Sequence, residues 1–325
     1  MRLRNLCAMA AAIVAAFGLS TDVSASVLGV AGGFNGFVFG NLSAEGGDTE
    51  GRLAVGGDFF AKWYAVGSGG IGPIVPLTNP PTDNLVVGGD LNAEGKWQVF
   101  NGNAVYGDAL IAAPTTPNGV TKQGTPVDFA TAKADLTAKS EFWGSLATNA
   151  SVVYDGYSTL TLTATNPGLN VFNVSEAYWE MTTSKQIVNP FPNATLLINI
   201  AGVNVTQSGG LSYNGSGSPS NAHSKVLFNY SDALTLDSSN IAILGSVLAP
   251  HANLTLSGGG INGNGIANNV VQRWGGEFHN FAFTGDLPTP GPDPEPTSTP
   301  EPSSAVICVA LCAMGTFAAR RRLFA

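Results

Sequence analysis

Three stretches in the first half of the chain share one pattern: "GRLAVGGDF" at 51–59, "NLVVGGDLN" at 84–92 and "GNAVYGDAL" at 102–110. Each places a few apolar residues before a glycine-rich turn that contains Asp. Short apolar strands between tight turns are typical of successive coils of a solenoid, in which each coil buries its apolar residues against its neighbours. The intervals between the stretches differ, so the repeat has no fixed period.

The second half continues this alternation of short apolar strands and turns. The segments are "TLTLTAT" (159–165), "ATLLINIAG" (194–202), "KVLFNY" (225–230), "ALTLDSSNIAILGSVLAP" (233–250) and "ANLTLSGGGINGNGIANN" (252–269). Strands of about five residues with turn signals roughly every eight to twelve residues indicate an all-β domain. Asn and Gly tolerate the left-handed backbone angles that tight corners need. We therefore predict an all-β fold, a right-handed parallel β-solenoid.

One segment, "TPVDFATAKADLTAKSEFWGSLATN", departs from the strand pattern. Thr125 is suited to cap the start of a helix, and Pro126 fits the first helical position. Apolar residues then recur at helical spacing, among them Phe129, Leu136 and Trp143. The spacing predicts one long amphipathic helix over about 126–147, lying along the side of the β-solenoid and covering an apolar flank.

The N-terminus has the features of a secretory signal peptide. Arg2 and Arg4 precede an apolar run from Leu6 to Leu19, and small residues surround Ala25. This order predicts a signal peptide over 1–25 that a signal peptidase cleaves after Ala25. The three cysteines are Cys7, Cys308 and Cys312, so the part between the terminal segments has neither a disulfide nor a thiol nucleophile.

The composition is acidic and poor in charge. The chain has 14 basic and 22 acidic residues, charged residues make up 11%, and Gly occurs 41 times. Nucleic-acid binding needs a basic stripe, so this balance excludes a nucleic-acid partner. Low charge together with abundant Gly is typical of a repetitive extracellular β protein.

The C-terminus divides into a proline-rich stalk at 287–303 and an apolar tail at 304–325. The tail follows Pro300, Glu301 and Pro302, and its apolar run ends at Arg320, Arg321 and Arg322. These features in this order resemble the PEP-CTERM sorting signal. The resemblance implies an exosortase as a processing partner, and membrane contact, transient or retained, through a tail helix. It also implies display at the cell surface or in the exopolysaccharide matrix of a bacterium with a Gram-negative-type envelope.

The part between signal peptide and stalk, 26–286, resembles the choice-of-anchor A family, whose extracellular domain occurs with different surface anchors. Blocks at 35–59, 243–270 and 275–288 carry the likeness. The "GSVLAP…GGGINGNGIA" block is also similar to the closing coils of bacterial ice-binding β-solenoids, which carry a long helix beside the coils. The resemblance supports a solenoid, while fold alone does not fix activity.

Glu277 and His279 are the candidate polar site. Residues two apart on a strand point to the same side, so this pair can act as acid and base or contribute two metal ligands. No motif nearby supplies further ligands, so we expect a structural role in the last coil. His223 lies in a Ser- and Asn-rich loop and is expected to be solvated, and His251 has no acidic neighbour.

We expect no cofactor, with calcium as the alternative. If the coils stack, one edge would carry the acidic residues of the turns, which offer oxygen ligands: Asp48, Glu50, Asp58, Asp90 and Asp108. The nine-residue Gly/Asp calcium repeat is absent, however, and Asp after Gly is also a good turn residue.

No nucleophile elbow, phosphate loop or paired-carboxylate motif is present. We therefore predict a non-enzymatic structural or adhesive protein associated with exopolysaccharide or biofilm. The alternative is a carbohydrate-binding or carbohydrate-active protein whose aromatic residues stack on sugars; the candidates are Trp63, Tyr64, Trp97, Tyr178 and Trp179. Ice binding is a further alternative, through a row formed by Thr159, Thr161, Thr163 and Thr165.

Overall fold

The computed structural model describes residues 26–95, 97–215 and 223–291. It divides into a compact body that ends at Pro288 and a second unit from Thr289 onward, of which only 289–291 are described. Ala25 and the sorting signal, with the predicted signal and tail helices, lie outside the described residues. The helices among the described residues are too short or too polar to span a bilayer.

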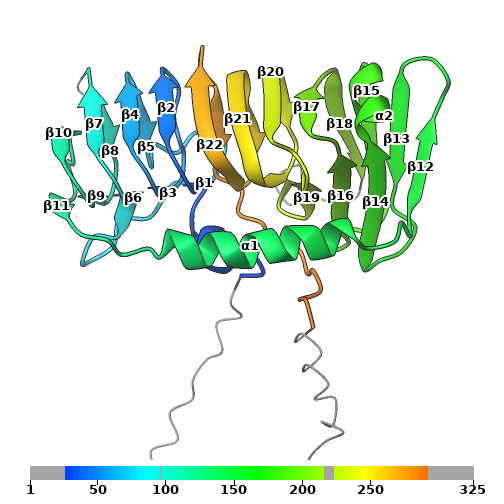
Figure 1. Cartoon of the computed structure of the whole chain (residues 1–325), viewed down its shortest axis with the longest axis horizontal. Coiled ribbons are helices and arrows are strands. Elements are labelled where there is room, and N and C mark those ends of the chain that lie inside the picture. Colours follow the sequence, from blue (N-terminus) through cyan, green and yellow to red (C-terminus); the bar gives the residue numbers. More distant parts are fainter. Residues whose placement is uncertain (1–25, 96, 216–222, 292–325) are drawn as a thin grey trace, which may run out of the picture. The chain divides into compact units, whose positions relative to one another are not determined.

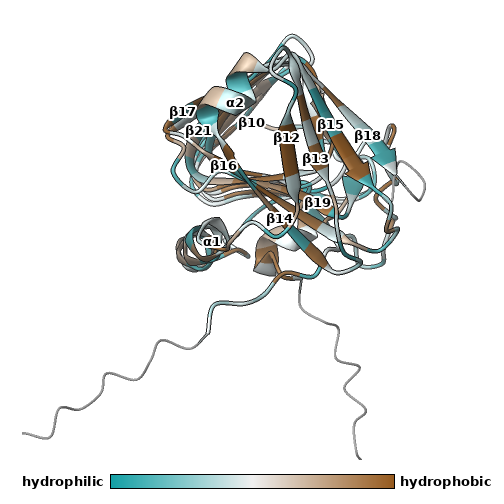
Figure 2. Cartoon of the chain, turned by 90° about the vertical axis from the view of Figure 1, so that its right-hand side faces the viewer, coloured by the Kyte–Doolittle hydropathy of each residue, from teal (hydrophilic) through white to brown (hydrophobic). Residues whose placement is uncertain are grey.

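The body is a parallel β-solenoid whose coils have three sides, as the end-on view in Figure 2 shows. One side, which we call the helix face, is a sheet of parallel strands. In spatial order these are β11 (Thr121–Gln123), β9 (Asn103–Tyr106), β6 (Asp83–Val87), β3 (Leu53–Val55), β1 (Gly36–Val38), the start of β22 (Gly265–Arg273), the start of β21 (Ser246–Asn262), β19 (Val226–Asn229), β16 (Thr195–Ala201) and β14 (Leu169–Ser175). The predicted mostly-β solenoid class is confirmed.

The second side, the open face, is also parallel. Its strands are β10 (Leu110–Ala112), β7 (Leu91–Glu94), β4 (Phe59–Lys62), β2 (Leu42–Glu45), the end of β22, the middle of β21, the start of β20 (Thr235–Ile243) and β17 (Asn204–Gln207). The long strands β20, β21 and β22 bend at the corners and therefore contribute to more than one side.

The third face is less continuous. It contains β8 (Gln98–Val99), β5 (Ala65–Val66), β23 (Glu277–His279) and the ends of β21 and β20. At one end it continues as the sheet of β12 (Ser151–Tyr154), β13 (Thr159–Thr163), β15 (Ser184–Asn189) and β18 (Gly210–Gly215). Within this sheet β12 runs antiparallel to β13.

The coils do not stack in the order of the sequence. The first coil, with β1 and β2, lies between the coil of β3 and β4 and the last coil, which contains β22. The first half of the chain runs outward from the centre to β11, and the second half returns to the centre from the opposite end (Figure 1). The expectation that each coil packs on its sequence neighbours therefore fails in the middle of the body, where Phe37 pairs with Ile266.

Helix α1 (Phe129–Gly144) connects the two halves and lies along the helix face (Figure 1). The predicted helix is present, but the prediction that it starts at Pro126 with Thr125 as its cap is wrong. Asp128 caps it instead, since its carboxylate accepts hydrogen bonds from the Thr131 backbone N–H at 3.0 Å and from the Thr131 hydroxyl at 2.7 Å. A 3₁₀ helix, η1 (Gly29–Gly33), packs beside α1.

A second helix, α2 (Glu176–Met181), was not expected from the sequence. It joins β14 to β15 and so takes the place that strand β17 has in the next coil. Ser175 caps it through a hydrogen bond from the Tyr178 backbone N–H at 3.4 Å. Trp179 is fully buried and donates its indole N–H to Gln207 Oε1 at 3.0 Å, so the helix contributes to the core.

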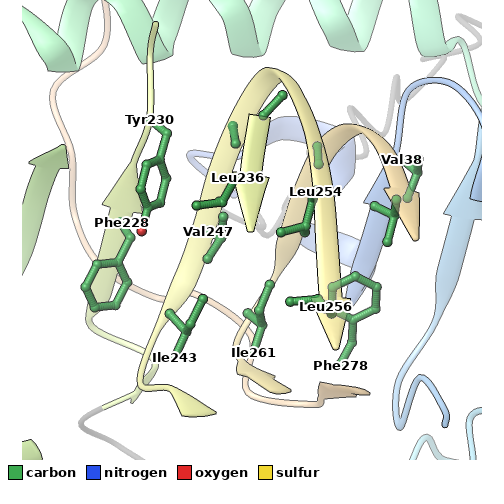
Figure 3. Close-up of a cluster of buried hydrophobic side chains, with 14 of the residues drawn as sticks. Val38, Phe228, Tyr230, Leu236, Ile243, Val247, Leu254, Leu256, Ile261 and Phe278 are labelled. Atoms are coloured by element: carbon green, nitrogen blue, oxygen red, sulfur yellow. The ribbon is translucent and has the colours of Figure 1, made fainter. Parts of the chain in front are cut away.

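The core fills the inside of the coils. Figure 3 shows side chains of neighbouring coils that point toward one another, including Leu236, Val247, Leu254 and Phe278. Each of these is at most 1% exposed. Because the inward residues of paired strands are in register, the apolar side chains of one coil pack on those of the next.

Candidate binding surfaces

The helix face is largely covered by α1. Its outward side chains include Phe37, Ala54, Val86, Leu197 and Leu248, and all of them are buried. Trp143 of α1 is also fully buried, and its indole N–H donates to the Pro288 carbonyl oxygen at 2.7 Å. The middle of the helix face is therefore packed on both of its surfaces, and the open face is the larger uncovered side.

The open face presents an uncovered, regular set of polar side chains. In β2, Leu42 and Ala44 point inward while Ser43 and Glu45 are exposed. Across the paired strands, one outward row contains Glu94, Lys62, Glu45, Arg273, Ser257 and Ser239, of which Ser257 is buried. Neighbouring positions in such a row are about 4.8 Å apart, so the face offers hydrogen-bonding groups at a regular interval.

The corner between the helix face and the open face uses the turn carboxylates. Asp58 accepts a hydrogen bond from the Asp90 backbone N–H at 3.0 Å, and Asp90 accepts one from the Ala109 backbone N–H at 2.9 Å. Asn41 does the same for the Asp58 backbone N–H at 2.8 Å. These side chains connect one coil to the next, which gives the Gly-Gly-Asp pattern a structural explanation.

The acidic residues considered for calcium do not line one edge. Asp58 and Asp90 lie at the corner just described, whereas Asp48 and Glu50 lie on the third face. The described residues contain no group of three or more His, Cys, Asp or Glu side chains that could hold a metal ion.

Glu277 and His279 come together on the third face, at the centre of the body. His279 Nε2 lies 3.1 Å from Glu277 Oε2, and its Nδ1 lies 2.6 Å from Asn262 Oδ1. His223 joins this cluster, since its Nδ1 lies 3.4 Å from Asn262 Nδ2 and its ring packs edge-on against Phe281. The expectation that His223 is solvated is wrong: the residue is buried, because the last coil folds over it.

Two further carboxylates border this cluster. Glu50 is buried and accepts backbone hydrogen bonds from Ile71 at 2.7 Å and from Gly72 and Asn280 at 2.9 Å. Burial raises the pKa of Asp48 to about 6, and the nearby Glu277 and Glu50 carboxylates add to the shift. Glu50 thus holds the loop after β5 against the last coil, which favours a structural role for the whole cluster.

The threonine row occupies the end sheet of the third face. Thr159, Thr161 and Thr163 lie on the outer side of β13, where they are half-buried. Thr165 lies beyond the strand, and its hydroxyl donates to the Asn149 carbonyl oxygen at 3.0 Å. Beside the row, β15 and β18 contribute outward Ser184, Gln186, Val188, Ser212 and Asn214. The outer surface here is uncharged.

The aromatic candidates divide between core and surface. Tyr64, Trp97 and Trp179 are buried, whereas Trp63 is 66% exposed and Tyr178 is 49% exposed. The sequence analysis missed Trp274, which is 81% exposed. The signal that could have found it is the repeated order of strand, basic residue and Trp: Lys62 precedes Trp63 at the end of β4, and Arg273 precedes Trp274 at the end of β22.

Comparison with known proteins gives one family and several structural neighbours. The profile of an ice-binding-like adhesive domain matches residues 27–280. An ice-binding protein from the Antarctic ascomycete Antarctomyces psychrotrophicus aligns over 78% of this chain and 96% of its own, with 12% identity and a TM-score of 0.37. A glycosylated ice-binding protein from an Arctic yeast aligns over 82% and 96%, with 14% identity and a TM-score of 0.38. A search of curated proteins found no match.

The matched range covers most of the chain and contains every strand of the solenoid, together with α1 and α2. This range also fits the choice-of-anchor A resemblance of the sequence. The chain belongs to the family of ice-binding-like adhesive domains.

Proposed function

We propose that the chain is a non-enzymatic, exported adhesive protein that acts at the cell surface or in the extracellular matrix, in association with exopolysaccharide. The observation that carries the proposal is the contrast between a helix face covered by α1 and an open face with a regular row of polar side chains. Membership of an adhesive family supports it. An adhesive domain needs an extended accessible surface and no catalytic group.

The adhesive role is tested by deleting the protein from the producing cells and restoring it. Cells without it should adhere more weakly to washed exopolysaccharide, and the protein should sediment with that matrix. If the protein stayed in the supernatant and adhesion did not change, the proposal would be wrong.

Delivery to the surface is part of the same proposal. A signal peptidase would cut after Ala25, and an exosortase would process the tail that follows Pro300, Glu301 and Pro302. Deleting 300–325 should release the protein into the medium. An unchanged surface fraction would contradict this route while leaving the adhesive role of the body untouched.

A carbohydrate-active enzyme is the rival class. Its most reasonable acid–base pair is Glu277 and His279, which lie within hydrogen-bonding distance of each other. Turnover of a polysaccharide by the purified protein, abolished in Glu277→Ala or His279→Ala, would overturn the non-enzymatic proposal. We expect no turnover in the wild type.

Ice binding is the second candidate, and the uncharged outer surface around Thr161 favours it. Flat, regularly spaced hydroxyl and methyl groups suit an ordered water surface. If this sheet binds ice, the wild type should inhibit ice recrystallisation, and Thr161→Tyr should remove the effect by breaking the flat surface. An inactive wild type would exclude this candidate.

A further inference from the structure

The corner between the open face and the third face contains two exposed tryptophans in a conformation that tryptophan rarely adopts. In six neighbouring coils, the residue that follows the open-face segment has a positive φ angle at this corner, which we call the left-handed corner. Its members, in spatial order, are Gly95 (82°), Trp63 (52°), Gly46 (77°), Trp274 (49°), Gly258 (70°) and Asn240 (54°). Glycine adopts such angles freely, while a bulky side chain is strained there.

The distribution of tryptophan in the molecule makes this corner unusual. The chain has five tryptophans. Trp97, Trp143 and Trp179 are buried at 4% exposure or less, and the other two are the exposed ones at the left-handed corner. A positive φ at a bulky residue and an exposed indole both reduce stability. Their occurrence together at two equivalent positions therefore indicates a functional role for these tryptophans.

The coils set the spacing of the two tryptophan backbones. Trp63 and Trp274 lie on either side of Gly46, since Glu45 pairs with both Lys62 and Arg273. Their backbones are therefore about two strand spacings apart, roughly 9.6 Å. The space above Gly46 is open, because a Cβ atom placed there would meet no atom within 4 Å.

Polar and charged groups border the aromatic pair on both sides. Glu45, Lys62 and Arg273 lie one residue before the corner on the open face, and Lys62 Nζ lies 4.7 Å from the centre of the Trp63 ring. Asp48 and Glu277 follow on the third face, two residues after Gly46 and three residues after Trp274, respectively. Aromatic rings flanked by hydrogen-bonding groups match a sugar, which has an apolar C–H face and hydroxyls at its rim.

We propose that the left-handed corner binds an extended β-linked neutral polysaccharide, with Trp63 and Trp274 stacked on sugar rings about two residues apart and the glycan chain running along the solenoid axis. The inference deepens the proposed function and rests on it for the source of the ligand. It assigns the exopolysaccharide contact to one corner of the body and to two named side chains.

The test uses the purified full chain and replaces each tryptophan by glycine. Glycine occupies Gly46, Gly95 and Gly258, the equivalent positions of neighbouring coils, so Trp63→Gly and Trp274→Gly fit the backbone. The thermal midpoint should stay the same or rise in both. Tyr157→Ala is the matched control, because Tyr157 is 87% exposed and lies outside the corner, in the turn between β12 and β13.

Binding is measured by affinity electrophoresis in gels that contain hydroxyethyl cellulose, laminarin or, as an α-linked comparison, dextran. The wild type and Tyr157→Ala should be retarded by at least one β-linked glucan and not by dextran. Each single glycine variant should bind about tenfold more weakly, as expected for the loss of one stacking contact. The double variant should migrate as in a gel without glycan.

Tryptophan fluorescence locates the contact. Cello-oligosaccharides of increasing length should protect the indoles of the wild type from acrylamide, with a marked increase once an oligomer reaches about three sugars and can contact both rings. In the double variant the remaining tryptophans are buried and no protection should appear.

Two results would overturn this site. The first is a wild type that none of the glucans retards. The second is a double variant that binds as well as the wild type. Neither result decides the adhesion of cells to their own matrix, which is measured separately, so failure of the corner and failure of the adhesive role are distinguishable. If the purified protein binds glucan through this corner but cells that lack it adhere normally, the corner is a binding site and the adhesive role is wrong.

Discussion

The helix face and the open face are built from the same coils, yet one is covered and the other is not. Their strands have the same parallel pairing and the same inward apolar residues, and they differ in the residues that point outward. Phe37, Ala54 and Val86 on the helix face pack beneath α1 and its neighbouring segments, while Ser43, Asn92 and Glu45 on the open face meet water. The more apolar outward residues of the helix face therefore explain why this side is the one that a helix covers.

The largest effect should follow from breaking the contact between α1 and the helix face. Trp143→Ala removes a fully buried indole and leaves the Pro288 carbonyl without its donor. We expect the free energy of unfolding to fall by about 3–5 kcal/mol, measured by denaturant titration. Tyr157→Ala, an exposed aromatic, should change it by less than about 0.5 kcal/mol. Equal losses in the two variants would mean that α1 adds little to the body.

A smaller effect is expected from the polar contacts under the same helix. Asn229 donates to the Ser140 carbonyl oxygen and to Asn199 Oδ1, both at 2.9 Å, and it accepts from the Ser140 hydroxyl at 2.6 Å. Asn229→Ala leaves these buried partners unpaired and should cost about 1–3 kcal/mol. Asn214→Ala, on the exposed outer side of β18, is the control and should unfold as the wild type does.

The third face contains a partly buried carboxylate, Asp48, and the pH dependence of stability tests the effect of its charge. Because the pKa of Asp48 is raised to about 6 in the folded state, the folded protein binds the proton more tightly than the unfolded chain. The stability that this provides is present below about pH 4 and is lost as the pH rises through 6. Asp48→Asn should therefore stabilise the protein at pH 8 by about 1 kcal/mol, since partial exposure screens the charge, and should have little effect at pH 4. A gain of equal size at both pH values would contradict a charge effect.

The smallest effect should come from the charges of the open face. Lys62 Nζ lies 4.0 Å from Glu94 Oε2, and both side chains are partly exposed. Lys62→Ser should change the free energy of unfolding by less than about 0.5 kcal/mol, and added salt should shrink the difference further. A loss as large as that of Asn229→Ala would show that the open face is also held by its outward residues.

The sequence predicted the strands, the solenoid class and the long helix, because those follow from local apolar spacing. It did not predict the coil order, since the pairing of Phe37 with Ile266 depends on contacts between residues more than 200 positions apart. The start of α1 was misplaced because Thr125 and Asp128 are both good capping residues, and only the backbone shows which one caps.

The candidate site was predicted less well. The Glu277 and His279 pair follows from the alternation of a strand, and the structure brings the two side chains together. The burial of His223 does not follow from its loop composition, because distant residues such as Phe281 cover it. Trp63 and Trp274 are 211 residues apart in the sequence, and only the adjacency of first and last coils places them on one corner.

The contact between the first and the last coil also determines when folding of the chain can be completed. Until β22 is available, β1 and β2 present unpaired strand edges at the middle of the body, and so does β21. Exposed edges of this kind invite pairing with other chains. Contacts of such large sequence separation form slowly. The last coil therefore completes the fold. A chain that ends before about residue 273 would leave the inner strands of both halves without a partner, so that they could pair with other chains.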